Sequence, residues 1–315
     1  MADSRNRTYS DVSEFVLSCF SESQSSLNWT SIPLALVFLL TIIANITLLV
    51  TIYIAPSLHH PMYYCLCFLV AVDLLLSFSI TPRVLAILWF DEKSISSTAC
   101  FSQTFLIFFC QAMESSVYQL MAYDRYIAIC HPLHYSSIIT SKLIAQAVTV
   151  SLASNMVLIL PFPFLTANLH YCARTTVTHC FCDTVALLKL ACGNTSLQYA
   201  YSLVVLVTLM CILTIGLAFS YSFIIRAVLR LASAESALKA FHTCSSHLTL
   251  IGAVYCVLII SGFSARMNTL IPQYGHILLA FVRYLTLPVL NPLVYGMQTQ
   301  DIRQAIKKLY KKISI

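Results

Sequence analysis

Seven long apolar segments, separated by short polar connections, dominate the chain. They lie near residues 32–55, 62–89, 100–129, 142–165, 197–230, 240–265 and 274–297. A helix rises about 1.5 Å per residue, so each segment can cross a hydrocarbon core of about 30 Å. Backbone groups inside a bilayer must bond within their own segment, which favours helices over an open sheet. The pattern therefore predicts an all-α membrane protein, a seven-transmembrane helix bundle.

The two ends of the chain differ from this bundle, which we place at 32–297. Residues 1–31 are polar and predict an extracellular tail, with no pattern typical of a cleaved signal peptide before the first span. Within residues 298–315, Ile302, Ile306 and Leu309 recur at i, i+4 and i+7 among lysines. This spacing predicts a short amphipathic helix in the cytosolic membrane interface; a solvated basic tail is the alternative.

Lysine and arginine residues near the ends of the spans are divided unevenly between the two sides. One side holds Arg125, Lys142, Arg226, Arg230, Lys239, Arg303, Lys307, Lys308, Lys311 and Lys312. The other side holds Arg5, Arg7, Lys93, Arg174, Lys189 and Arg266. Because cytosolic loops carry the excess of positive residues, this bias predicts a cytosolic C-terminus and an extracellular N-terminus.

Composition narrows the class of protein further. The chain is 59% hydrophobic and only 10% charged, whereas a soluble domain carries about 25% charged residues. The net charge of +6 comes without a basic run outside the C-terminal tail, which argues against nucleic acid as a partner. The sequence has no G-x-S-x-G, H-E-x-x-H or P-loop pattern, so we expect no enzyme.

Four polar side chains fall at a similar depth inside four spans: Asn45, Asp73, Glu114 and Asn291. Counting residues from the inner face places the two carboxylates about 15 Å deep. Lipid tolerates ionisable groups only where they face protein, water or ions. Two buried carboxylates share a proton or recruit a cation, so we expect a proton or sodium site here. A hydrogen-bonded polar core without an ion is the alternative.

Two motifs lie where spans reach the inner membrane face. Asp124, Arg125 and Tyr126 end the third span, so an adjacent acid and base meet water there. In the seventh span, residues 291–295 form an N-P-x-x-Y pattern that contains Pro292 and Tyr295. Proline removes a backbone hydrogen bond and kinks a helix. We interpret the acid–base pair as a latch and the kinked segment as a moving part.

Taken together, these motifs resemble those of odorant receptors, a branch of the rhodopsin-like G protein-coupled receptors. The string from Met121 to Cys130 is similar to the signature at the inner end of their third helix. Residues 60–64 (His-Pro-Met-Tyr-Tyr) are similar to the motif that opens their second helix, and residues 239–248 look like their sixth-span signature. The resemblance covers nearly the whole chain. Residues 61–64 and the outer loops look more like class I, the fish-like branch.

This resemblance implies an olfactory receptor in the plasma membrane that binds a small odorant in the outer half of the bundle. It also implies activation of a stimulatory olfactory G protein and cAMP signalling, and a sodium ion at Asp73 with Glu114 as its partner. Span six departs from most rhodopsin-like receptors, since it has no proline and carries Tyr255 where a tryptophan is frequent. The departures argue against an aminergic or peptide receptor.

The outer cysteines allow several pairings. With Cys100 at the outer end of the third span, Cys172, Cys182 and Cys192 make four cysteines that can pair in three ways. The resemblance implies Cys100–Cys182 and Cys172–Cys192, with Cys180 left free. His179 and its neighbouring cysteines also have the ligand types of a soft-metal site, a weaker alternative because a disulfide removes a ligand.

Candidate ligand contacts lie on two helical stripes in the outer half of the bundle. They are Thr104, Ile107, Phe108 and Gln111 in the third span, and Tyr255, Ile259 and Phe263 in the sixth. Ordinary interhelical packing is the alternative for each. Arg266 could bind a carboxylate, since class I receptors often favour carboxylic acids; snorkelling to lipid headgroups is an equal interpretation. Arg283 lies inside the seventh span, where an arginine should face the bundle and have a partner or a ligand.

Two N-x-S/T sequons, at Asn6 and Asn28, are candidate glycosylation sites. Two other functions stay open. The chain could be a rhodopsin-like receptor for a non-odorant metabolite, which sequence does not distinguish from an odorant receptor. An ion- or proton-coupled transporter could also use Asp73, Glu114 and Arg283, but transporters often show inverted repeats and we find none.

Overall fold

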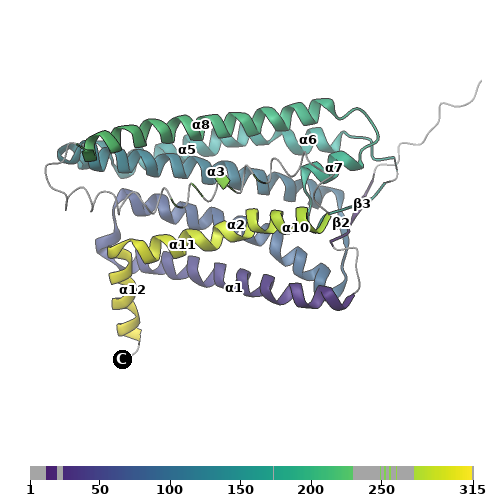
Figure 1. The fold of residues 1–315 in the computed structure, drawn as a ribbon, viewed down its shortest axis with the longest axis horizontal. Helices are drawn as coiled ribbons and strands as arrows, with labels where there is room; N and C mark the ends of the chain where they lie inside the picture. The colour runs from purple at the N-terminus through teal and green to yellow at the C-terminus, as the bar shows by residue number, and fades with distance from the viewer. Residues whose placement is uncertain are drawn as a thin grey trace, which may run out of the picture.

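The computed structural model describes residues 12–19, 24–172, 174–229 and 273–313, with isolated positions at 249, 252, 255, 256 and 260. The long helices are α1 (Gln24–Ile54), α2 (Pro61–Phe90), α3 (Ser97–Cys130), α5 (Ser141–Ile159) and α8 (Ser196–Leu229). Another long segment runs through α10 (Gln273–Phe281), η3 (Val282–Thr286) and α11 (Leu287–Gln298). All lie side by side along the long axis of the molecule (Figure 1). The prediction of an all-α bundle is confirmed.

Shorter elements occupy the two ends of the bundle. At one end are η1 (Pro56–Leu58), η2 (Pro132–His134), α4 (Tyr135–Ile138) and α12 (Gln300–Ile313). At the other are β1 (Glu14–Leu17), β2 (Ser94–Ser96), β3 (Thr176–Val177) and α7 (Thr184–Leu190), while α6 (Pro161–Ala167) continues the line of α5. The predicted sixth span, 240–265, lies outside the described residues except for its isolated positions.

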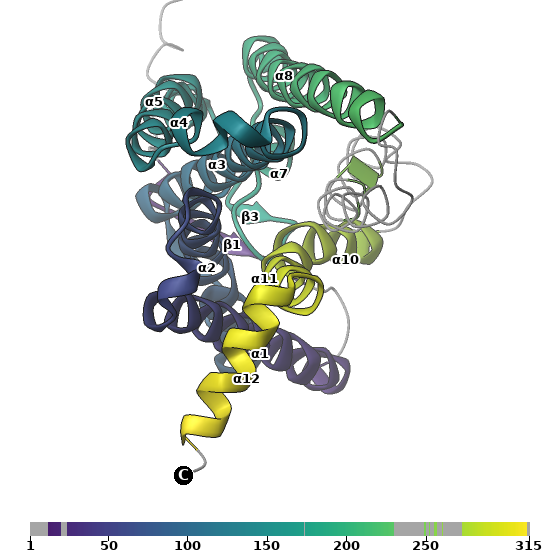
Figure 2. The same cartoon turned by 90° about the vertical axis from the view of Figure 1, so that its left-hand side faces the viewer.

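Within the described residues, five helical segments are long and apolar enough to cross a membrane. They are Ser31–Ile54, Pro61–Phe90, Ser141–Ala167, Ser196–Leu229 and Gly275–Gly296. The more polar α3, which carries Gln103, Gln111 and Glu114, is not among them. It packs against α2, α5, α6 and α8 near the middle of the bundle (Figure 2). Protein rather than lipid surrounds much of α3, so its surface does not need to be as apolar.

Helix ends follow the local sequence. Pro61 occupies the first turn of α2, where its missing N–H costs no helical bond. The side chains of Ser96 and Thr140 accept from Ala99 N and Leu143 N at the starts of α3 and α5. Each cap supplies a partner to a backbone N–H that would otherwise lack one.

The seventh span changes its helical geometry halfway along. The wider π turn of η3 precedes Pro288, which lies at the start of α11. Because Pro288 has no N–H, the carbonyl four residues earlier lacks an ordinary helical partner, and π turns occur where the usual ladder is interrupted. Asn45 Nδ2 on α1 donates to Pro288 O at 2.9 Å. Pro292 lies further along the same segment.

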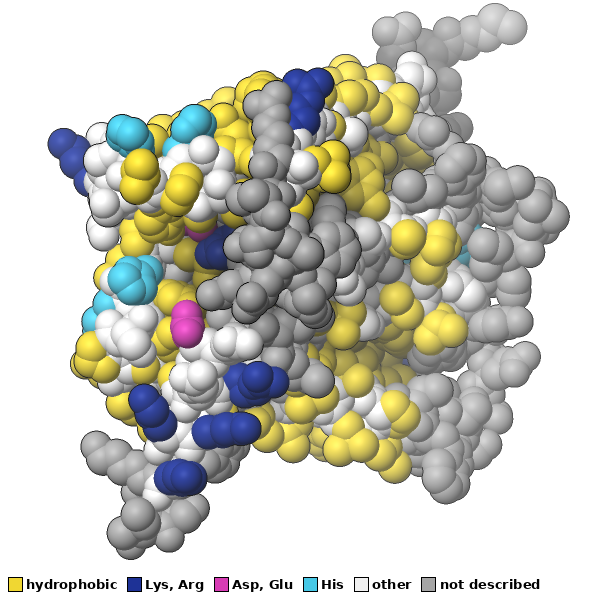
Figure 3. All heavy atoms as spheres, turned by 60° about the vertical axis from the view of Figure 1, so that its left-hand side comes forward, with side chains coloured by type: hydrophobic (Ala, Val, Ile, Leu, Met, Phe, Trp, Pro, Cys, Tyr) yellow, Lys and Arg dark blue, Asp and Glu magenta, His cyan; other side chains and the backbone are white. Residues whose placement is uncertain are grey.

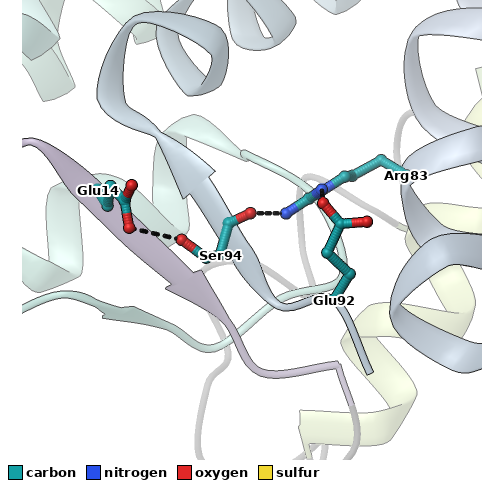
Figure 4. Close-up of polar contacts among 4 residues, drawn as sticks. All are labelled: Glu14, Arg83, Glu92 and Ser94. Carbon is teal, nitrogen blue, oxygen red and sulfur yellow. Dashed lines mark hydrogen bonds and ion pairs between the residues drawn. The ribbon is translucent and has the colours of Figure 1, made fainter. Parts of the chain in front are cut away.

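The outer end carries a small sheet of strand order β2-β1-β3. β1 pairs antiparallel with β2 and parallel with β3, so the N-terminal segment lies between two loops of the bundle. Phe15 and Leu17 of β1 are fully buried. Figure 4 shows the polar contacts that hold this region: Arg83 contacts Glu92 and Ser94 O, and Ser94 Oγ donates to Glu14 at 2.7 Å.

Three disulfides join the outer segments within the described residues. Cys100–Cys182 and Cys172–Cys192 are present, and Cys19 pairs with Cys180. The expectation that Cys180 would be free is therefore wrong. Strand β1 runs beside β3 and brings Cys19 to Cys180, a neighbourhood that the four-cysteine count left out.

At the opposite end, α12 turns across the bundle and ends the described chain (Figure 1). Helix α12 packs against α11, α1 and η1, and its Ile302 is fully buried in the core. Its basic side chains Arg303, Lys307, Lys308 and Lys311 are exposed. Figure 3 shows basic side chains gathered on this end and hydrophobic side chains along the flank. The spacing of apolar residues therefore does correspond to a helix with one packed face.

Candidate functional site

A cavity lies between α3, α6, α8 and η3. Its volume is about 70 Å³. One water requires about 10–15 Å³, so the cavity has room for several waters or a small ligand. Its apolar lining includes Phe108, Phe162, Val205, Leu206, Leu209 and Met210. Its polar lining consists of Gln111, Glu114, Ser115, Tyr118, Ser202 and Arg283.

An aromatic wall forms one side of this cavity. The rings of Phe108 and Phe162 stack with their centroids 5.0 Å apart and their planes 5° from parallel. Tyr201 on α8 packs against Phe162 at 5.2 Å and donates its hydroxyl to Leu158 O at 2.6 Å. These contacts tie α3, α5, α6 and α8 together, so the wall is fixed by packing rather than by a single helix.

Arg283 and two α3 residues, Gln111 and Glu114, form the part of the polar cavity lining that we call its floor. Arg283 Nη2 donates to Gln111 Oε1 at 3.2 Å, and the guanidinium carbon lies 5.1 Å from the centre of the Tyr284 ring. Arg283 Nε is buried and has no hydrogen-bond partner among the described residues, and the same holds for Glu114 Oε1. The floor therefore offers both an unused donor and an unused acceptor.

Below the floor, a buried polar network joins three helices. Asn291 Nδ2 contacts both carboxylate oxygens of Asp73, at 3.1 and 3.0 Å. Tyr118 Oη donates to Asn291 Oδ1 at 3.0 Å. Asp73, Glu114 and Asn291 are all at most 5% exposed, and Asn45 is fully buried but bonds instead to Thr41 O and Pro288 O. The structure thus buries all four predicted polar residues.

The inner end contains the acid–base pair. Arg125 Nη2 lies 3.2 Å from Asp124 Oδ2, and Tyr135 Oη of α4 donates to Asp124 Oδ1 at 2.7 Å. Partial burial and the nearby Asp124 carboxylate raise the pKa of Tyr135 above its usual value, so its hydroxyl keeps its proton. The fully buried Asp124 therefore forms an ion pair with Arg125 and accepts one hydrogen bond, from the neutral hydroxyl of Tyr135.

Neighbouring side chains support this inner end. The ring of Tyr126 packs against Phe219 and Phe223 of α8, and Tyr295 Oη lies 3.8 Å from Met121 Sδ. Tyr63 Oη donates to Asp301 Oδ2 at 3.2 Å, which links the start of α2 to α12. The contacts between helices here are non-covalent.

The predicted ligand contacts divide into three groups. Phe108, Gln111 and Arg283 line the cavity. Thr104 instead bonds to Cys100 O and Cys182 O, Ile107 packs in the outer core, and the hydroxyls of Tyr255 and Thr214 lie 2.6 Å apart. Ile259, Phe263 and Arg266 lie outside the described residues, as does the sequon at Asn6. Asn28 lies in the first turns of α1.

Some residues were missed by sequence reasoning. The apolar pattern did not predict that Phe162 lines the cavity or that the Tyr135 hydroxyl bonds to Asp124, because both roles depend on packing between segments. Cys19 did have a signal. Counting it gives six cysteines on the outer side, an even number that can pair completely.

Comparison with known proteins identifies the family. A family model described as olfactory receptor matches residues 34–312. The chain belongs to the olfactory receptor family. It is 43% identical to human olfactory receptor 56A4 over 99% of this chain and 100% of that protein. Human olfactory receptor 52K2 is 40% identical over 90% of each chain, and mouse olfactory receptor 56B34 is 40% identical over 95% of this chain and 93% of its own.

Family membership confirms several predictions. The receptor is a multi-pass plasma-membrane protein of the seven-transmembrane, G protein-coupled class. Its partner classes are an odorant and a G protein, and the family is not enzymatic. The resemblance stated from the motifs was therefore correct at the level of the family.

Proposed function

We propose that the receptor binds a small, water-soluble odorant in the cavity between α3, α6, α8 and η3, and that it couples to the stimulatory olfactory G protein to raise cAMP. One observation carries this proposal. The cavity floor at Arg283 and Glu114 lies next to the buried Asp73–Asn291–Tyr118 network, and Asn291 opens the Asn-Pro-x-x-Tyr segment of α11. A ligand on the floor therefore touches residues adjacent to the kinked helix.

The ligand acts by differential affinity for two arrangements of the bundle. It can shift their populations only by binding one arrangement more tightly than the other. Arg283 sits in the π turn just before Pro288 and Pro292, where the helix has fewer regular backbone bonds. In the proposal, a ligand that contacts Arg283 changes the position of α11 and of Tyr295.

At the inner end, the proposed response is release of the latch at Asp124 and Arg125, with Tyr126 in the coupling surface. The pair is held by one ion pair and one hydroxyl hydrogen bond, so small energies open it.

The exposed basic face of α12 and the lysine and arginine bias support a cytosolic C-terminus and an extracellular N-terminus. The motif at Pro61-Met62-Tyr63-Tyr64 supports the class I branch.

A sodium ion is part of the proposal as an allosteric modulator. Sodium would take oxygen ligands, and the residues present fit this requirement. Two buried oxygens near this level, Asn45 Oδ1 and Ser77 Oγ, have no hydrogen-bond partner within the described residues. Asp73 adds its carboxylate. The ion would neutralise one of the two negative charges and would favour the arrangement in which the carboxylates stay together.

The test is cAMP production in cells that express the receptor, challenged with pooled short carboxylic acids, aldehydes and alcohols. We expect a ligand-dependent rise that Arg125→Ala abolishes, whereas Arg174→Ala, an exposed outer-loop change, leaves it intact. A response that survives Arg125→Ala would contradict the latch. Ligand-independent ion flux that disappears with Asp73→Asn would contradict the receptor function and support a transporter.

A further inference from the structure

The floor of the cavity carries polar groups whose hydrogen-bonding capacity is not used up. Arg283 has five N–H donors; one reaches Gln111, and the buried Nε has no partner in the described part of the chain. Glu114 is 5% exposed, and its Oε1 likewise has none. A buried polar atom without a partner costs free energy, which a ligand group of the right kind can recover.

The charges on the floor balance when the carboxylate pair holds the single cation proposed above. Glu114 lies near the second buried carboxylate, Asp73, and one cation between them, sodium or a proton, leaves a single negative charge. Arg283 lines the same cavity as Glu114 and supplies one positive charge. The sum is zero before any ligand enters. A ligand that brings its own charge therefore leaves an uncompensated charge in a buried, mostly apolar cavity.

The rest of the cavity limits the size and polarity of the ligand. The walls are apolar, with the stacked Phe108 and Phe162 rings on one side and leucine and methionine side chains of α8 on the other. Ser115 and Ser202 donate their hydroxyls to backbone carbonyls, at Gln111 O and Tyr199 O. The polar anchor points are therefore concentrated at Arg283, Gln111 and Glu114.

We infer that this cavity selects uncharged, short-chain odorants in which a carbonyl oxygen accepts from Arg283 and a nearby hydroxyl donates to Glu114, the pattern of a small hydroxy-ketone. The inference rests on the proposed function, since it names the ligand class of the same site. The carbonyl oxygen accepts from Arg283 Nε, the hydroxyl donates to Glu114 Oε1, and the short alkyl part lies against the aromatic wall. A monofunctional ketone or alcohol satisfies only one of the two groups.

A carboxylate is disfavoured by the same geometry. It gains from Arg283 but places a second negative charge beside Glu114, and it has no hydroxyl proton for Glu114 Oε1. A primary amine has the opposite fault, because it faces the Arg283 guanidinium. Among ligands of equal carbon number, the expected order of affinity is hydroxy-ketone, then ketone or alcohol, then carboxylate and amine.

The experiment measures ligand-induced thermal stabilisation of the purified full-length receptor, which needs no G protein. The ligands are four- and five-carbon compounds on matched skeletons: 3-hydroxy-2-ketone, 2-ketone, 2-alcohol, carboxylate and amine. We expect the hydroxy-ketone to bind at least tenfold more tightly than the carboxylate. A carboxylate that binds as tightly or more tightly overturns the inference, and so does a panel in which no oxygenated compound binds.

Two substitutions test the assigned groups. Glu114→Gln removes a negative charge and should narrow or reverse the preference against the carboxylate, while Arg283→Gln should weaken hydroxy-ketone and ketone at least tenfold. Arg226→Gln, an exposed change at the inner end, is the matched control. An unchanged ratio of hydroxy-ketone to carboxylate affinity in Glu114→Gln contradicts its role. If a variant does not fold, the wild-type order alone decides.

The two levels of the proposal fail separately. Stabilisation by the hydroxy-ketone without a cAMP response would contradict the proposed coupling and leave the ligand class standing. A cAMP response in which the carboxylate is the strongest ligand would contradict the ligand class and leave the receptor function standing.

Discussion

The two ends of the bundle are held together by different kinds of bond. At the outer end, three disulfides and a three-stranded sheet join the N-terminal segment, α3 and the loop before α8. At the inner end, the contacts are non-covalent: side-chain packing, the Asp124–Arg125 ion pair, and single hydrogen bonds such as Tyr135–Asp124 and Tyr63–Asp301. The outer end is covalently fixed, and the inner end is reversibly closed.

The magnitudes explain what this difference allows. A disulfide contributes about 2–4 kcal/mol by restricting the unfolded chain, whereas one intramolecular hydrogen bond contributes only about 0.5–1.5 kcal/mol net. A disulfide is a covalent bond that ligand binding does not open, whereas a differential affinity of about 1–3 kcal/mol is enough to offset one such hydrogen bond. Movement on activation should therefore concentrate at the inner end while the outer end keeps the cavity intact.

The largest effect should come from breaking the outer frame. Cys100→Ser removes the link to Cys182 across 82 residues, and the chain-entropy relation for a loop of that length gives about 4.5 kcal/mol. We expect little receptor at the cell surface, measured by flow cytometry against an N-terminal epitope. Cys211→Ser, at an exposed free cysteine, is the control. Normal surface levels of Cys100→Ser would show that the frame is not needed.

A smaller effect should follow from weakening the inner closure. Tyr135→Phe removes the hydroxyl that donates to Asp124, and at this half-exposed position the loss should be about 1 kcal/mol. The closed arrangement would then be about fivefold less favoured, so ligand-independent cAMP per surface receptor should rise. Tyr53→Phe, at an 83% exposed position, should change nothing. Lower basal cAMP would mean that Tyr135 supports the active arrangement instead.

The smallest effect concerns pH at the outer end. Burial lowers the pKa of His179, an effect that Lys189 and His276 reinforce and Asp183 opposes. As pH falls below about 6.5, the unfolded chain binds a proton that the folded receptor does not, so stability falls by at most about 1.4 kcal/mol per pH unit.

Thermal melting of the purified receptor at pH 7.5 and pH 5.5 checks this expectation. The melting temperature should be lower at pH 5.5, and His179→Gln should reduce the difference, whereas His59→Gln at the exposed inner end should not. A melting temperature that rises on acidification would mean that protonated His179 is stabilised in the folded receptor.

The sequence predicted those features that depend on position along one helix. The rise per residue was enough to bring Asp73, Glu114 and Asn291 to one depth, and the structure buries all three. Helical spacing alone did not show which of Thr104 and Gln111 lines the cavity, because the two residues lie two turns apart on one face of α3. Gln111 reaches the cavity, but Thr104 meets Cys182 O, and the path of that loop is not encoded in a helical period.

Features built from several segments could not be predicted either, because a helical period does not specify which segments meet. The cavity requires the packing of α3, α6, α8 and η3, and only its α3 and seventh-span contributors were named in advance. The pairing of Cys19 depends on a strand that the apolar spans do not predict. Local propensity defines elements well, whereas contacts between loops depend on the finished fold.

The Cys19–Cys180 link also has a consequence for how the receptor is made. Its two cysteines are separated by 161 residues, which take roughly 8–32 s to synthesise at about 5–20 residues per second. Throughout that interval the Cys19 thiol has to stay reduced, or exchange out of a wrong pairing with Cys100 or Cys172, because its partner does not yet exist. The yield of correctly assembled receptor is therefore set partly by the thiol chemistry of the compartment in which it is translated.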